Sequence, residues 1–116
     1  MASLVEIPEP WTPAQATERI RSIADGQFYL SYKDHATEQM EARGIIVGDV
    51  NYVLRNGIVY QNPVEATRKH LWKYAIESKA PNSKNREIRI VLIPDWKVKG
   101  FKLITIMWAD EPMTTR

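Results

Sequence analysis

The residues best suited to chemistry are a histidine and an arginine on one predicted helix, His35 and Arg43. At about 100° per residue, both side chains leave the same flank of that helix, with Gln39 between them. A helix rises about 1.5 Å per residue, so the two Cα atoms are about 12 Å apart. That distance is too long for a shared grip on one phosphate oxygen, but long side chains can address one scissile group and its neighbour.

Histidine has the ordinary pKa nearest to physiological pH, which makes His35 the natural candidate for proton transfer. Both residues also have ordinary structural explanations. A histidine near a helix N-terminus is commonly a surface or capping group, and Arg43 can satisfy the last carbonyl groups of its helix. The spacing alone therefore leaves a catalytic and a structural role open.

Further cations come from the second half of the chain, where residues 70–77, 87–93 and 101–108 alternate as strands. We expect one face of each strand to meet the helices. The residues on that face are Trp72, Tyr74 and Ile76 in the first strand, Ile88, Ile90 and Leu92 in the second, and Ile104, Ile106 and Trp108 in the third. The other face then carries Lys73, Arg89 and Thr105 among apolar groups. Such a face suits a phosphate-bearing ligand or a protein partner. Alternatively, Lys73 and Arg89 form ordinary surface pairs with Glu77 and Glu87.

The first half of the chain predicts the helices that must position these residues. Thr12, Pro13 and Gln15 form a capping box with proline at the first helical position, and Asp25-Gly26 ends that helix. A second helix runs from Asp34 to about Arg43. A third runs from about Gly48 to Asn56-Gly57. Phe28-Tyr29-Leu30 is a brief extended stretch, and Ile58-Val59-Tyr60 begins the strand-rich half.

The pattern predicts one α+β domain over residues 12–110, with an extended arm at 1–11 and a tail at 111–116. We expect N-terminal helices packed on one face of a three- to four-stranded antiparallel sheet. The chain has 116 residues, 44% of them hydrophobic, and no cysteine, which suits a reducing cytoplasm. No apolar run is long enough to cross a membrane.

Some classes of function are disfavoured by what the chain lacks. It contains no HExxH motif, no cysteine cluster and no glycine-rich phosphate loop, so we expect neither a metal site nor a cofactor. The net charge of +2 and an isoelectric point near 8.9 lean toward anionic partners.

Several short motifs resemble a bacterial family known as domain of unknown function 4258. They are His35-Ala36, Met40, Arg43-Gly44-Ile45, Asp49-Val50, Val53-Leu54, Asn56-Gly57, Arg89-Ile90-Val91 and Ile104-Thr105. The resemblance covers roughly residues 30–108, and its most specific part is the histidine-alanine pair followed by Met-x-x-Arg-Gly-Ile. That family is similar to the RelE-like and barnase-like small ribonucleases, which place N-terminal helices before a four-stranded antiparallel sheet.

The resemblance implies metal-independent RNA cleavage, in which a 2′-hydroxyl attacks the adjacent phosphorus and leaves a cyclic phosphate and a 5′-hydroxyl. His35 would be the general acid or base, and Arg43 and Arg89 would neutralise the phosphorane charge. Lys73, Tyr74 and Thr105 would contact substrate. The family pattern usually has a basic residue where this sequence has Gln39, which removes one potential phosphate contact from the helical flank.

Two hypotheses follow from these residues. The first is an endoribonuclease that acts as the toxin of a bacterial toxin–antitoxin pair, with RNA as substrate and an antitoxin protein as partner. The second is a non-catalytic module of the same fold that binds protein or nucleic acid through the mixed face. The N-terminal arm with Trp11 favours the second, because it could extend an interface or form a homodimer.

Overall fold

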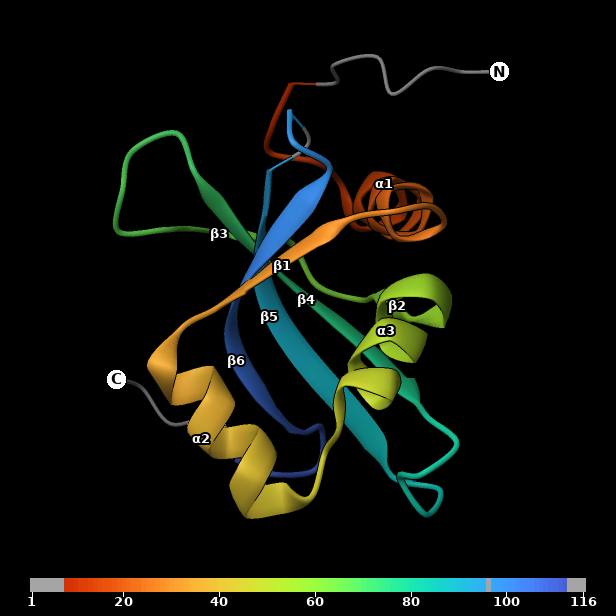
Figure 1. Cartoon of the computed structure of the whole chain (residues 1–116). Helices are drawn as coiled ribbons and strands as arrows, with labels where there is room; N and C mark the ends of the chain where they lie inside the picture. The colour runs from red at the N-terminus through yellow and green to blue at the C-terminus, as the bar shows by residue number, and fades with distance from the viewer. Residues whose placement is uncertain (1–7, 96, 113–116) are drawn as a thin grey trace.

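The computed structural model describes residues 8–95 and 97–112 and has an α+β architecture (Figure 1). Within these residues the helices are α1 (Pro13–Ala24), α2 (Asp34–Arg43) and α3 (Val47–Asn56). The strands are β1 (Tyr29–Tyr32), β2 (Ile58–Val59), β3 (Val64–Glu65), β4 (Trp72–Lys79), β5 (Glu87–Asp95) and β6 (Gly100–Trp108). No helix in the described part of the chain has the length and apolar character needed to span a bilayer.

The helix boundaries follow the predicted signals closely. The Thr12 hydroxyl accepts a hydrogen bond from the Gln15 backbone N–H at 3.1 Å, and the Gln15 side chain accepts one from the Thr12 N–H at 3.0 Å. This capping box pairs two amide groups that the first turn would otherwise leave unsatisfied. At the C-terminal end of α2, Gly44 adopts φ 68°, the left-handed conformation that glycine enters without a Cβ penalty.

The sheet is larger than predicted and is mixed, so the expected three- to four-stranded antiparallel sheet is wrong. Its order is β1-β6-β5-β4-β2, and β3 pairs with β4. The long strands β4, β5 and β6 are antiparallel neighbours, as expected, but β1 runs parallel to β6. A strand of four residues has too little alternation to be recognised locally. Its partner β6 lies about seventy positions further along the chain, so no local pattern indicates the pairing.

The helices divide between two places on the sheet. Helices α1 and α3 pack on each other and cover one face, over β2 and β4 (Figure 1). Helix α2 instead lies beside β6, away from the other two helices (Figure 1). The covered face supplies most of the core, including Tyr74, Ile76, Ile88, Ile90, Leu92, Leu103 and Ile106.

Trp11 belongs to this core, although the sequence placed it at the end of an extended arm. It is 1% exposed, and its ring stacks on Tyr74 with centroids 5.2 Å apart. The expected dimer through the arm stays a prediction for residues 1–7, which lie outside the described residues. Trp11 itself is packed inside the domain.

A bulge changes the phase of β6. The register shifts between Val91 and Leu92, where Leu92 pairs with Leu103 and Val91 pairs with Thr105. Ile104 is therefore the extra residue, and the alternation reverses on either side of it. Ile106 faces the helices as predicted, but Ile104 lies on the opposite face, where it lines a groove.

Candidate functional site

Two hollows of about 370 and 340 Å³ lie on the sheet face opposite α1 and α3 and share Lys33, Lys73 and Ile104. We call them together the basic groove. The first is bounded by the flank of α2 and by β4, β5 and β6, and is lined by Lys33, His35, Gln39, Arg43, Val64, Lys73, Val91, Ile104, Thr105, Met107, Glu111 and Pro112. The second continues under the chain between β3 and β4, and adds Ala66, Thr67, Arg68, Leu71, Ile93 and Lys102.

The basic groove brings together five of the seven predicted site residues. They are His35, Gln39, Arg43, Lys73 and Thr105. His35 is exposed in the first turn of α2, and Lys73 is half-buried in β4. An exposed imidazole thus shares one hollow with an ammonium group and a threonine hydroxyl, although α2 and β6 are far apart in sequence.

Arg43 reaches this groove but is already engaged. Its guanidinium donates two hydrogen bonds to the Glu111 carboxylate, from Nε at 2.8 Å and from Nη2 at 2.6 Å. Glu111 also accepts the backbone N–H of Trp108 at 3.2 Å. The hydrogen bond with Arg43 lowers the pKa of Glu111, so this carboxylate is held in its charged form. The bidentate pair fastens the end of α2 to the segment after β6, and a phosphate must compete with Glu111 for Arg43.

Gln39 has a structural partner that accounts for its side chain. Its Oε1 accepts the backbone N–H of Ile106 at 2.8 Å. Where β6 continues past its pairing with β1, its outer edge has no neighbouring strand among the described residues. Gln39 therefore accepts a hydrogen bond from an outward amide group of β6 that no strand pairs. An amide oxygen can accept this hydrogen bond, whereas a basic side chain could not, since lysine and arginine carry only donors.

The Gln39→Ala variant is expected to lose about 1 kcal/mol of unfolding free energy, because the half-buried Ile106 amide loses its acceptor. Urea denaturation followed by circular dichroism measures this loss. Glu38→Ala is the matched control, since Glu38 is exposed on the same helix and should change stability by less than about 0.5 kcal/mol. Equal stability of the two variants would show that the edge hydrogen bond is dispensable.

Arg89 lies on the groove face but outside the groove lining. It stands directly across from Glu77 in the β4–β5 register, and its Nε donates to Glu77 Oε2 at 2.7 Å. Both side chains are only 16% exposed. The predicted cross-strand pair with Glu77 is therefore confirmed for Arg89, but the pair is largely buried and is not a surface pair.

Tyr74 is not brought to the groove. Its side chain is fully buried on the helix-covered face. Its hydroxyl donates a hydrogen bond to Glu9 Oε2 at 2.9 Å and accepts one from the backbone N–H of Trp11 at 2.9 Å. Alternation along β4 sends Lys73 and Tyr74 to opposite faces, so the two could not both contact a ligand in one groove.

Sequence reasoning missed three cations of the groove, Lys33, Arg68 and Lys102. Lys33 ends the segment that pairs with β6, and Arg68 lies in the connection between β3 and β4. Lys102 precedes the bulge, so simple alternation from Ile106 sends it to the wrong face. Within residues 8–95 and 97–112, no ion pair takes up Lys33, Lys73 or Lys102.

Comparison with known proteins gives one family and no individual relative. A search of curated proteins found no match, and a search of solved structures found none either. The model of the family described as Domain of unknown function (DUF4258) matches residues 32–108. That segment includes α2, the long strands and most of the groove lining, and leaves α1 and most of β1 outside. Since the match spans well over half of the sequence, the chain belongs to the DUF4258 family.

Proposed function

We propose that this protein is a metal-independent endoribonuclease that holds RNA in the basic groove, and that it acts as the toxin of a bacterial toxin–antitoxin pair in the cytoplasm. We also propose that the protein is related to the RelE-like or barnase-like small ribonucleases and that an antitoxin protein is its partner. The observation that carries it is the presence of an exposed histidine and several lysines without carboxylate partners in one groove of the described chain.

The electrostatics of the groove favour a polyanion. Lys33 and Lys73 line both hollows, and Lys102 and Arg68 extend the positive charge along the second one. Glu111 is the one carboxylate in either lining of the described residues, and it is neutralised by Arg43. Several cationic side chains in one groove can bind the phosphates of a nucleic acid and release the counterions condensed on it.

The residue types in the groove suit transesterification within RNA. The imidazole of His35 accepts the proton of the 2′-hydroxyl as its oxygen attacks the adjacent phosphorus, and the bond from phosphorus to the 5′-oxygen breaks. The departing oxygen takes a proton from a groove ammonium group or from water, and the products are a 2′,3′-cyclic phosphate and a 5′-hydroxyl. Lys33 and Lys73 supply the positive charge that stabilises the phosphorane oxygens.

The alternative is a non-catalytic module of the same fold. One observation favours it: Arg43 and Arg89, the two guanidinium groups that the family resemblance assigns to the phosphorane, are both paired with carboxylates. A module of this kind would bind RNA or a protein partner in the groove without altering the RNA. Cleavage separates the two functions directly, because binding is expected from both.

The test uses purified protein and a fluorescent RNA in buffer that contains a chelator. We expect fragments with cyclic phosphate and 5′-hydroxyl ends, identified by mass spectrometry, and growth arrest when the protein is expressed in bacteria. The double variant Lys33→Ala/Lys73→Ala is expected to bind RNA more weakly. The slope of log K against log salt should fall by roughly 0.7 for each phosphate that is no longer neutralised.

The control is the double variant Lys79→Ala/Lys84→Ala, which removes the same charge from exposed positions outside the groove lining. Its RNA affinity and salt slope should stay close to those of wild type. Intact RNA with retained, groove-dependent binding would leave the non-catalytic module as the function. Equally weakened binding in the two double variants would contradict the assignment of the groove.

A further inference from the structure

The edges of the sheet are protected unequally. At one end, β2 is only two residues long, and Asn62-Pro63 follows it closely. At the other end, α2 and the Gln39 side chain cover β6 beyond its pairing with β1. Only β1 among the described strands forms an outer edge that lacks such devices, because Tyr29–Tyr32 contains neither proline nor charge. Monomeric proteins generally blunt an edge of this kind.

The outward backbone groups of β1 are identified by its pairing with β6. The Tyr29 N–H donates to the Lys99 carbonyl at 3.0 Å, and the Lys33 N–H donates to the Leu103 carbonyl at 3.0 Å. Since the direction of the backbone N–H and C=O groups alternates along a strand, those of residues 29, 31 and 33 point toward β6. The N–H and C=O groups of Leu30 and Tyr32 therefore point away from the sheet, and the segment has Ser31 at its centre.

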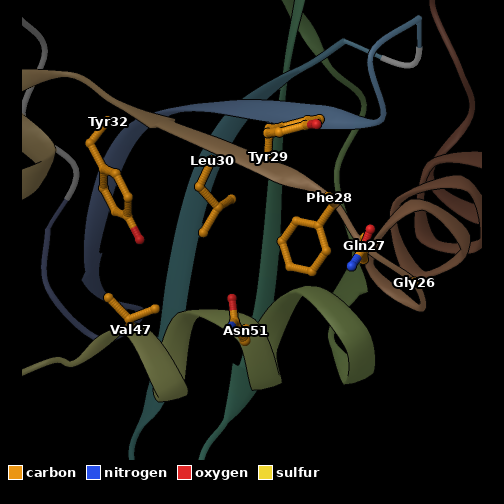
Figure 2. A pocket seen from close by; sticks show the side chains of 8 residues that line it. All are labelled: Gly26, Gln27, Phe28, Tyr29, Leu30, Tyr32, Val47 and Asn51. Carbon is orange, nitrogen blue, oxygen red and sulfur yellow. The ribbon is translucent and has the colours of Figure 1, made fainter.

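Hollows lie on both sides of this edge. A hollow of about 670 Å³ separates β1 from α3, and Figure 2 shows Leu30 and Tyr32 directed into it from above and Asn51 from below. Tyr32 Oη and Asn51 Oδ1 are buried and have no hydrogen-bond partner among the described residues. On the opposite face, a hollow of about 280 Å³ lies beside Tyr29, whose side chain is 73% exposed.

We propose that the edge of β1 pairs with β1 of a second copy, antiparallel and about a two-fold axis at Ser31, so that two sheets become one. In this register Leu30 exchanges both backbone hydrogen bonds with the second copy's Tyr32, and the reverse pair forms by symmetry. A two-fold axis normal to the sheet keeps each face on its own side. The second copy's Tyr32 therefore comes to the mouth of the hollow that contains Asn51.

A second copy fits this edge because the strand is complementary to itself. Leu30 meets a tyrosine ring on the hollow side, where Phe28 and Val47 add apolar surface. On the other face, exposed Tyr29 comes opposite the second copy's Lys33, an aromatic and a cation that attract each other. Ser31 faces its own symmetry mate, and two small neutral side chains can approach there without repulsion.

The pairing also has a consequence for the basic groove. Lys33 lines that groove and stands two residues from the axis, on the same face as Ser31. The two copies of the groove then open on the same face of one continuous sheet, with both Lys33 side chains near its centre. The dimer proposal stands on the edge alone and does not depend on RNA cleavage.

Analytical ultracentrifugation of the full chain tests the proposal from about 1 µM to about 1 mM at low salt. Wild type is expected to pass from monomer to dimer in this range. Ser31→Glu and Ser31→Lys each place like charges across the axis, and each should weaken the dimer by roughly 2- to 5-fold. An equimolar mixture of the two variants should recover the dimer, because opposite charges then face each other.

Ser31 is exposed, so both substitutions are compatible with the fold, and circular dichroism verifies this. Ser22→Glu and Ser22→Lys, at an exposed position of α1, are the matched controls, and they should dimerise as wild type does. A wild-type chain that stays monomeric throughout the range overturns the proposal. A dimer that is indifferent to both Ser31 variants, or a mixture without recovery, also overturns it.

Discussion

The His35→Ala variant is expected to cleave RNA about 10²- to 10⁴-fold more slowly than wild type, which is the usual contribution of a positioned acid or base. RNA affinity should change little, because the phosphate contacts that we assign come from Lys33 and Lys73. Single-turnover cleavage with enzyme in excess measures the chemical step, and fluorescence anisotropy on the same RNA measures binding. A large loss of rate with constant affinity is the signature of a group that acts in the transition state.

The matched control for this prediction is His70→Ala. His70 is the other histidine of the chain and is exposed in the connection before β4, outside the groove lining. Its substitution should leave the rate unchanged, and a loss of activity in His35→Ala but not in His70→Ala, after the same purification, excludes a contaminating nuclease as the source of activity. Full activity of His35→Ala would assign proton transfer to other groups, and the role proposed for His35 would be wrong.

The part of the fold that local signals encode was predictable. The capping box at Thr12 fixed the start of α1, and glycine at 44 fixed the end of α2. Alternation located β4, β5 and β6 to within two residues and correctly assigned Ile88, Ile90 and Leu92 to the core. These signals are local, since each depends on residues within about one turn or one strand of each other.

The errors come from interactions that are remote in sequence. Pairing of β1 with β6 made a brief extended stretch into an edge strand, and the bulge at Ile104 turned Lys102 toward the groove. Arg43 and Glu111 are 68 positions apart, so no local pattern indicates that the guanidinium is taken. Glu111 is the first residue of the predicted C-terminal tail, and the ion pair joins it to α2.

The sequence could place together those candidate site residues that lie on a single helix, because their spacing alone determines which flank they share. His35, Gln39 and Arg43 share the flank of α2, and all three do line the groove. Tyr74 was assigned from the family resemblance, and alternation along β4 buries it on the face opposite to Lys73. Lys33 was missed because its position depends on how β1 leads into α2.

The Trp11→Ala variant is expected to lose roughly 3–5 kcal/mol of unfolding free energy, the usual cost of removing a large aromatic side chain from a core. Trp11 is 1% exposed and stacks on Tyr74, and its backbone N–H donates to the Tyr74 hydroxyl. Removing the indole leaves a cavity beside that ring. Urea denaturation followed by far-ultraviolet circular dichroism is the appropriate measurement, because it does not depend on tryptophan fluorescence.

Trp11→Phe is the matched control, and it should lose clearly less, since a smaller ring can still stack on Tyr74. A loss below about 0.5 kcal/mol for Trp11→Ala would place the segment before α1 outside the cooperative unit. The expected large loss bears on the family as well. The family match begins at residue 32, yet Trp11, Ile20 and Ile23 lie in the core that supports β4. The matched segment alone would therefore expose one side of Tyr74, and the folding unit must begin before α1.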